Sequence, residues 1–140
     1  MTAIADPIAA VVAMLKADAG VIAAASTRVY GGELPRAQSD DQPRKALVVK
    51  AVGGGSLDPG YQRWGDHRLD VIAYGETPHE AYELWRTAHA PLKDLARSKH
   101  AGTVLFWARP AGGPVAMRDA DTDWPIVVSS WQVLASEVPV

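Results

Sequence analysis

Apolar residues recur at helical spacing near the start of the chain. The first set is Ile8, Val11, Val12 and Leu15, at positions i, i+3, i+4 and i+7. Asp6 can accept hydrogen bonds from the free N–H groups that begin such a helix, and Pro7 fits its first position. The pattern predicts a helix that starts after Asp6 and stops or bends at Gly20, with one further short turn over Val21–Ala25.

A second helical stretch has a clearer start. Thr77-Pro78-His79-Glu80 is a capping box, in which Thr77 can accept from the Glu80 N–H while Glu80 reaches back. The apolar residues that follow at helical spacing are Ala81, Leu84, Trp85, Ala88, Leu92 and Leu95. The pattern predicts a helix of about five turns, ended by His100-Ala101-Gly102. Pro91 is expected to kink or divide it, because proline removes a backbone hydrogen bond and crowds the preceding turn.

Four runs have the composition or alternation of β-strands. They are Ala46–Val52, Arg68–Tyr74, Thr103–Ala108 and Ile126–Leu134. The second run alternates most clearly, as expected for a half-buried antiparallel strand. Short connections between strands favour antiparallel pairing. We therefore predict one α+β domain over residues 1–140, a small antiparallel sheet of about four strands with two main helices packed on one face.

Polar and glycine-rich segments separate these elements. Residues 31–45 contain two prolines and predict a long loop. Gly53–Gly65 holds five glycines and predicts the oversized, flexible tip of a hairpin. Gly112-Gly113-Pro114 predicts a turn, and Ala120–Trp124 predicts an acidic loop.

Composition limits the possible functions. Apolar residues make up 48% of the chain and charged residues 21%, which is typical of a folded globular protein. The formal net charge is −2, and no run of basic residues is longer than Arg44-Lys45, so the chain lacks the charge pattern of a sequence-independent DNA binder. The absence of cysteine excludes disulfides, thiolate metal sites and a cysteine nucleophile. The N-terminus lacks a basic region typical of signal peptides, and no apolar run would span a bilayer, so we expect a soluble protein made inside a cell, with no membrane partner.

Two segments resemble ligand sites but fail the templates. Asp119–Asp123 begins like a calcium loop, yet Trp124 and Ser130 occupy the positions of the required glycine and glutamate. A solvated acidic turn explains it better. Gly53–Ser56 lacks the lysine of a phosphate-binding loop, and the helix that such a loop requires does not follow.

No catalytic constellation is visible in the sequence. The four histidines are His67, His79, His89 and His100. No pair has the i, i+4 spacing of a helical zinc site, and no serine lies in the sharp-turn context of a catalytic triad. We expect surface or structural histidines, no metal, no cofactor and no enzymatic activity.

Tryptophan is abundant, with five in the chain. Trp85, Trp107 and Trp131 fall on expected core or cross-strand positions. Trp64 and Trp124 lie in expected loops beside a charged residue, where interface contact and simple loop packing are equally plausible. The candidate interface residues are Tyr61, Arg63, Trp64 and Trp124.

The order of these features resembles that of a known family. A helix opened by Asp-Pro is followed by Arg28-Val29-Tyr30-Gly31-Gly32-Glu33-Leu34-Pro35. A strand, a glycine-rich tip, the alternating strand 68–74, a helix opening with Glu80-Ala81 and a final strand near Trp131 come next. The arrangement is similar to the tail terminator, or tail-completion, proteins of long-tailed bacteriophages, and the likeness covers nearly the whole chain.

The resemblance implies a structural role. Such a protein forms a ring, usually of six subunits, that caps the tail tube, ends its polymerisation and joins it to the connector on the head side. It implies three kinds of partner: other copies of the chain, the tail tube protein, and the head-tail connector or head-completion protein. DNA would pass through the lumen without specific binding, and the protein would be part of the virion after assembly in the bacterial host cytoplasm.

Other functions stay open at this point. Another neck, head-completion or minor tail protein would have similar features. A tube subunit should be mostly β, which the two predicted helices argue against. A small enzyme or ligand-binding domain would need convergent polar residues, which the sequence does not show.

Overall fold

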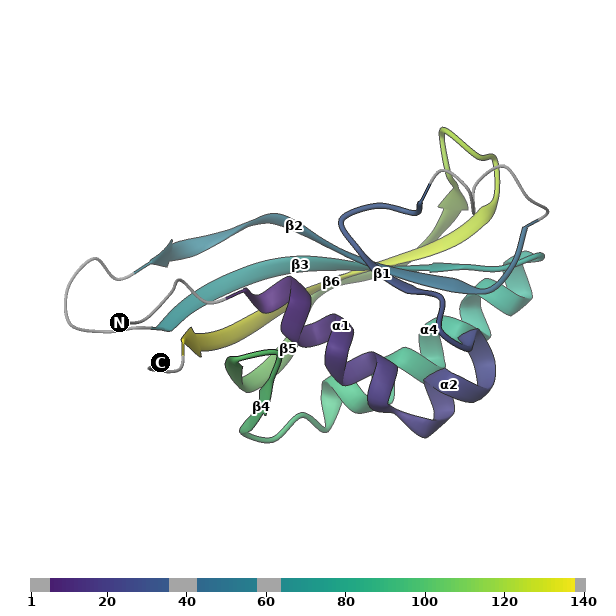
Figure 1. Cartoon of the computed structure of the whole chain (residues 1–140). Helices are drawn as coiled ribbons and strands as arrows, with labels where there is room; N and C mark the ends of the chain where they lie inside the picture. The colour runs from purple at the N-terminus through teal and green to yellow at the C-terminus, as the bar shows by residue number, and fades with distance from the viewer. Residues whose placement is uncertain (1–5, 36–42, 58–63, 138–140) are drawn as a thin grey trace.

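The computed structural model describes residues 6–35, 43–57 and 64–137 (Figure 1). The helices are α1 (Pro7–Ala17), α2 (Ala19–Ala25) and α4 (Pro78–Lys93). The strands are β1 (Val29–Gly31), β2 (Ala46–Leu57), β3 (Trp64–Tyr74), β4 (Ser98–His100), β5 (Thr103–Arg118) and β6 (Pro125–Glu137). None of the described helices alone is long and apolar enough to cross a membrane; α1 and α2 reach that length only as a pair bent by 85°.

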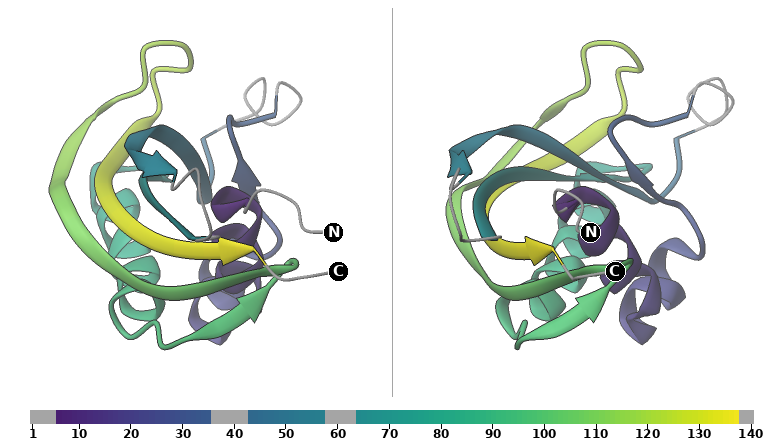
Figure 2. Two further views of the ribbon diagram at one scale, coloured as in Figure 1. Left: turned by 90° about the vertical axis from the view of Figure 1, so that its left-hand side faces the viewer. Right: turned by 60° about the vertical axis from the view of Figure 1, so that its left-hand side comes forward.

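All six strands belong to one sheet, in the order β1-β2-β3-β6-β5-β4. The sheet curls around the helices into a half-barrel (Figure 2). β1 runs parallel to β2, and the other neighbouring strands are antiparallel. The predicted four-stranded antiparallel sheet with two helices is therefore wrong: within the described residues the sheet is mixed, has six strands, and packs against three helices.

The glycine-rich segments account for part of this error. β2 and β3 continue beyond the predicted strands into the glycine-rich region, with irregular register between Ala51 and Leu57. β5 continues through Gly112-Gly113-Pro114 without ending, with register shifts on both sides of Gly112, so the predicted turn there is wrong. Glycine and proline in these strands mark β-bulges, which bend a strand without ending it. The expected flexible tip falls largely on residues 58–63, which lie outside the described residues.

The first helix begins as the sequence predicts and ends earlier. Asp6 Oδ1 accepts from the Ala9 N–H at 3.0 Å, and Pro7 is the first helical residue. The helix ends at Ala17, because Asp18 leaves helical geometry and its carboxylate accepts from the Val21 N–H at 3.1 Å. Gly20 therefore lies inside α2, and the short turn expected there is a separate helix.

The capping box that begins α4 is confirmed in part. Thr77 Oγ1 accepts from the Glu80 N–H at 3.2 Å. The Glu80 carboxylate reaches back one residue further than expected, to the Glu76 N–H at 3.1 Å. α4 ends at Lys93, short of the predicted end, and Pro91 falls in its last turn without dividing it.

The main core lies between the helices and the concave face of the sheet. Its largest buried side chains include Leu15, Leu47, Leu69, Leu84, Leu92, Leu105 and Trp131. α1 contacts both β1 and β4, the two outermost strands, so it bridges the open side of the half-barrel. The Asp6 N–H also donates to Thr103 Oγ1 at 3.2 Å, which ties the start of α1 to the start of β5.

Candidate interaction surface

The convex face of the sheet has no helix packed against it among the described elements. A second, smaller apolar cluster lies at one end of this face. Its buried members are Ala46, Val48, Ile72, Tyr74, Trp124 and Ile126. The alternation of β2 and β3 places these residues on the face opposite the main core. The convex face is therefore the part of the molecule where external contacts are to be sought.

Tyr74 and Trp124 form the centre of this cluster. Their rings meet edge to face, with centroids 5.9 Å apart and planes at 86°. Both side chains are almost fully buried, with 5% and 4% of their surface exposed. Of the two interpretations left open for Trp124, loop packing matches this position; a contact of Trp124 with a partner stays a prediction.

The acidic segment after β5 is a hydrogen-bonded turn. Asp119 Oδ2 accepts from the Thr122 N–H at 3.1 Å and from its hydroxyl at 2.7 Å. Arg118 Nη1 donates to the Asp123 carbonyl at 2.8 Å. The Trp124 N–H donates to Thr122 Oγ1 at 3.3 Å, which fixes the start of β6. The turn thus holds Trp124 in the cluster and projects Asp121 outward.

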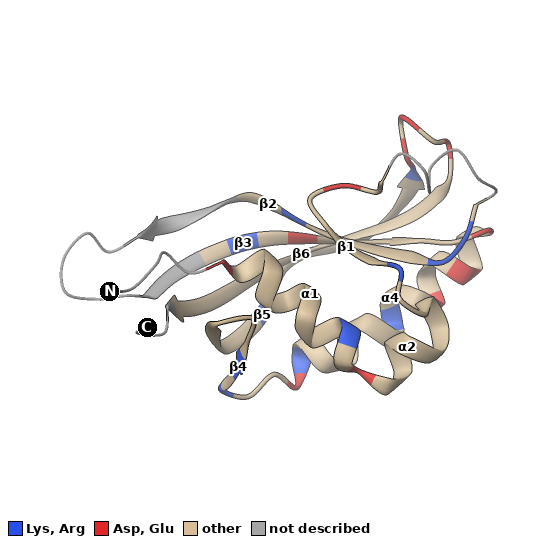
Figure 3. Cartoon of the chain, viewed as in Figure 1, with Lys and Arg blue, Asp and Glu red and all other residues tan. Residues whose placement is uncertain are grey.

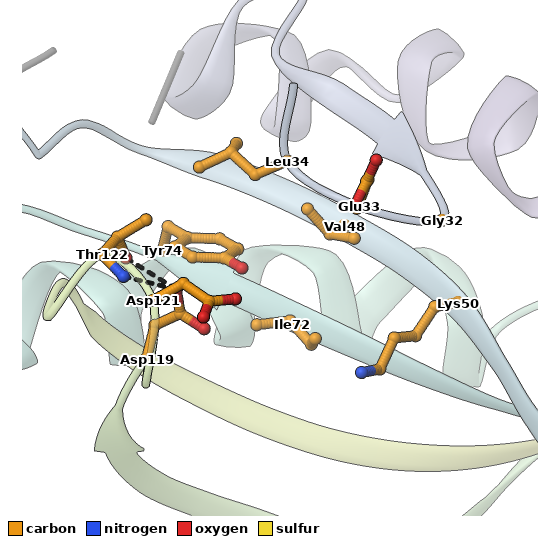
Figure 4. A pocket seen from close by; sticks show the side chains of 10 residues that line it. All are labelled: Gly32, Glu33, Leu34, Val48, Lys50, Ile72, Tyr74, Asp119, Asp121 and Thr122. Carbon is orange, nitrogen blue, oxygen red and sulfur yellow. Dashed lines mark hydrogen bonds between the residues drawn. The ribbon is translucent and has the colours of Figure 1, made fainter. Parts of the chain in front are cut away.

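A pocket of about 650 Å³ opens beside this turn (Figure 4). Its lining residues are Gly32, Glu33, Leu34, Val48, Lys50, Ile72, Tyr74, Asp119, Asp121 and Thr122. Leu34, Val48 and Ile72 form an apolar floor, while three carboxylates and one ammonium group stand around it. The pocket combines an apolar base with a rim of net negative charge.

The Tyr74 hydroxyl end is directed into this pocket, toward the space between Val48 and Asp121 (Figure 4). No hydrogen bond to this hydroxyl occurs among the described residues. Burial, and secondarily the charges of Asp119 and Asp121, raise the pKa of Tyr74 to about 12. The hydroxyl is therefore protonated at neutral pH.

The middle of the convex face is polar. Lys50 lies opposite Asp70 on β3, and Ser130 Oγ donates to Asp70 Oδ1 at 2.6 Å. Two residues further along the strands, Gln132 on β6 lies in register between Arg68 on β3 and Arg109 on β5. Several acidic residues lie at the end of the molecule that carries the 119–123 turn, as Figure 3 shows.

Two arginines lie against aromatic rings of β5. The Arg109 guanidinium is 4.2 Å from the Trp107 ring centre, and the Arg97 guanidinium is 5.6 Å from that of Phe106. Neither arginine has a hydrogen-bond acceptor among the described residues. Further along β5, Val115 and Met117 are about half exposed, at 49% and 50%.

Of the candidate interface residues named from the sequence, Tyr61 and Arg63 lie outside the described residues. Trp64 belongs to the first position of β3, opposite Ser136, so it lies in a strand and not in the expected loop. The sequence did not point to the pocket residues Glu33 and Tyr74. Tyr74 ends the most clearly alternating strand on the polar side of its pattern, and this was its one signal in the sequence.

Of the tryptophans expected on core or cross-strand positions, Trp131 is buried in the main core, Trp85 packs half-buried against it, and Trp107 is half-buried on β5 outside this core. His89 lies between the rings of Trp85 and Trp131, 5.2 Å from each centre. Trp131 Nε1 donates to Ser129 Oγ at 3.0 Å. His100 forms a 2.8 Å hydrogen bond with Ser98 Oγ on the short edge strand. Within the described ranges, no three or more histidine or acidic side chains are grouped as a metal site would require.

Comparison with known proteins identifies a fold relative. No protein-family model and no curated protein sequence matches the chain. Among solved structures, it is similar to a chain described as "Virion of native gene transfer agent (GTA) particle". The TM-score is 0.66, the identity is 15%, and the match covers 91% of this chain and 92% of the other. The two chains share a fold along almost their whole length.

Proposed function

We propose that this chain is a structural protein of a phage-like virion that forms a ring, of six subunits, at the end of the tail tube. In this role it ends tube polymerisation and provides the surface that meets the head-side connector. DNA passes through its lumen, and the chain performs no catalysis. The partners are other copies of the chain, the tube protein and the connector or head-completion protein, assembled in the cytoplasm of the bacterial host.

The observation that carries this proposal is the fold match to a chain of a gene transfer agent virion. The match includes nearly all of both chains, so it compares one whole fold with another and not a shared substructure. The motif order in the sequence supports the same class of protein independently. A half-barrel with a helix-free convex face also suits a subunit that touches several neighbours.

The competing proposal within the same class is a different neck component, such as a head-completion protein. A ring that caps a tube has cyclic symmetry, and each subunit offers two different surfaces to its neighbours. The convex face has this asymmetry, with the acidic pocket on the β1–β2 side and the stacked arginines on the β5 side.

Deleting the gene from a particle-producing strain tests the proposal. We expect free heads and tails of irregular length, because nothing would stop tube growth or complete the joint. Electron microscopy of the lysate measures both, and complementation with the intact gene should restore joined particles. Tails of normal length without attached heads would favour the head-completion role instead.

A further inference from the structure

The acidic pocket on the convex face is built to receive a positively charged side chain. Glu33, Asp119 and Asp121 surround an apolar floor, with only Lys50 to oppose them. The Asp119 carboxylate is already engaged by Thr122 within the turn. Glu33 and Asp121 have no hydrogen-bond partner among the described residues, so their charges are available to a ligand.

The position of Tyr74 is an independent indication of a ligand. Its side chain is 95% buried, since 5% of its surface is exposed, yet its hydroxyl has no partner among the described residues. The hydroxyl oxygen itself is not sealed from solvent, so it can accept a hydrogen bond from a group that enters the pocket. The hydroxyl end is directed into the pocket (Figure 4), where an incoming N–H group could donate to it.

The shape and charge of the pocket fit an arginine. The aliphatic stem of arginine can cover an apolar surface such as Leu34, Val48 and Ile72. Its planar head carries five N–H donors, enough to bond two carboxylates and a phenol oxygen at once. A bare divalent cation fits less well, because the described residues hold no group of three metal-ligating side chains here.

The chain itself offers a suitable arginine elsewhere on the same convex face. Arg109 is exposed on β5, and stacking on Trp107 at 4.2 Å limits the positions of its guanidinium. Three other arginines are already engaged: Arg28 with the Lys45 carbonyl at 2.7 Å, Arg86 with Glu83 at 3.1 Å, and Arg118 with the Asp123 carbonyl at 2.8 Å. Arg68 and Arg97 also lack an acceptor among the described residues, but Arg68 is not held by an aromatic ring. Arg109 has no acceptor among the described residues.

We propose that the pocket receives the Arg109 side chain of a neighbouring copy of this chain; this rests on the ring proposed above. The pocket is lined by β2, β3, the segment after β1 and the 119–122 turn. Arg109 lies on the same convex face, but it is in register with Arg68, four residues along β3 from Ile72, and two strands away from β3. That separation, about 10 Å across the strands and about 13 Å along them, exceeds the reach of an arginine side chain. A copy cannot fill its own pocket in this geometry. Repeating the contact from subunit to subunit gives a head-to-tail interface, the type that generates a ring.

Charge exchange tests this contact directly. In D121R and in R109D, we expect subunit association to weaken at least about tenfold, because each places like charges together. The double variant D121R/R109D should recover association to within about threefold of the unaltered protein, because the two charges again have opposite signs. Native mass spectrometry and sedimentation measure ring formation, and the unfolding free energy checks that each variant is folded. Unchanged association in both single variants, or no recovery in the double variant, would overturn the proposal.

A cross-linking experiment tests the same contact without relying on charge. Because the chain has no cysteine, E33C/R109C introduces the only two thiols. Oxidation at high protein concentration should produce a ladder of covalent oligomers, and E33C/R97C is the matched control with the other stacked arginine. A ladder no stronger than that of the control would overturn the Arg109 contact.

The outcomes separate this inference from the proposed function. If the unaltered chain forms rings and caps tails while the exchange variants behave normally, the Arg109 contact fails and the function stands. If gene deletion leaves joined tails of normal length, the proposed function fails, whatever the cross-linking shows.

Discussion

The concave and convex faces of the sheet differ in what covers them. The concave face is filled by three helices of the same chain, and its core includes a fully buried tryptophan with a satisfied N–H. The convex face has a smaller cluster, a polar middle, and a pocket into which the Tyr74 hydroxyl opens without a partner among the described residues. The concave face therefore stabilises the monomer, and the convex face is where we expect other molecules to attach.

The largest effect is expected in the concave core. Trp131 is 1% exposed, contacts His89, and donates to Ser129 Oγ. Trp131→Ala should lower the free energy of unfolding by about 3–5 kcal/mol, because it leaves a cavity that the rigid sheet cannot fill. Denaturant titration measures this change.

Trp124→Ala is the matched substitution on the convex face. Trp124 packs in the smaller cluster, so its replacement should cost less than that of Trp131. An equal or larger loss for Trp124 would mean that both faces contribute alike to the stability of the monomer.

The second effect concerns pH. The pKa of Tyr74 is raised to about 12 in the folded chain, whereas an unfolded tyrosine ionises near its ordinary value of 10.0. The folded state thus keeps a proton that the unfolded state loses, so stability is full below pH 10 and falls as pH rises toward 12. The loss should reach about 2 kcal/mol, since a tenfold difference in proton affinity corresponds to roughly 1.4 kcal/mol.

Comparison of two variants isolates this contribution of Tyr74. The difference in unfolding free energy between the unaltered chain and Tyr74→Phe should change by about 2 kcal/mol between pH 8 and pH 12, because phenylalanine has no proton to lose. Tyr82→Phe, at a tyrosine that is 43% exposed, is the control and should show no such divergence. Parallel curves for Tyr74→Phe and the unaltered chain would contradict the assignment.

The third effect is local to the helix layer. Thr77 Oγ1 caps α4 by accepting from the Glu80 N–H. Thr77→Ala should cost about 1 kcal/mol of stability, while Thr77→Ser keeps the acceptor and should cost much less. Thermal unfolding of the two variants measures the difference, and equal losses would show that the hydroxyl does not act as the cap.

The smallest effect is expected on the convex rim. Asp121 is exposed and makes no hydrogen bond among the described residues, so Asp121→Asn should change the unfolding free energy by less than about 0.5 kcal/mol. The same variant should reduce subunit association. A large loss of monomer stability would place Asp121 in the fold and not in an interface, against the contrast between the faces.

The sequence predicted those elements whose signals are local. Asp6 and Thr77 mark helix starts because a cap needs only the next few N–H groups, and both caps are present. The strand 68–74 was recognisable because one of its faces is buried against the helices. These predictions need no information about distant parts of the chain.

The missed elements depend on distant partners. β1 and β4 have three residues each and are strands only because β2 and β5 pair with them. In β5, Gly112 and Pro114 suggest a turn locally, yet pairing with β6 extends the strand through them. The pocket was not predicted for the same reason, since its residues come from four segments that only the folded sheet brings together.

The last strand of the described chain, β6, lies in the middle of the sheet, between β3 and β5. β3 and β5 do not pair with each other, so before β6 arrives the sheet consists of two separate parts. During synthesis, the edges of β3 and β5 that pair with β6 stay unpaired until residues 125–137 leave the ribosome. Folding is then dominated by contacts distant in sequence, which slows it. A chain released before β6 has no continuous half-barrel, so we expect unfinished subunits to be excluded from the proposed ring.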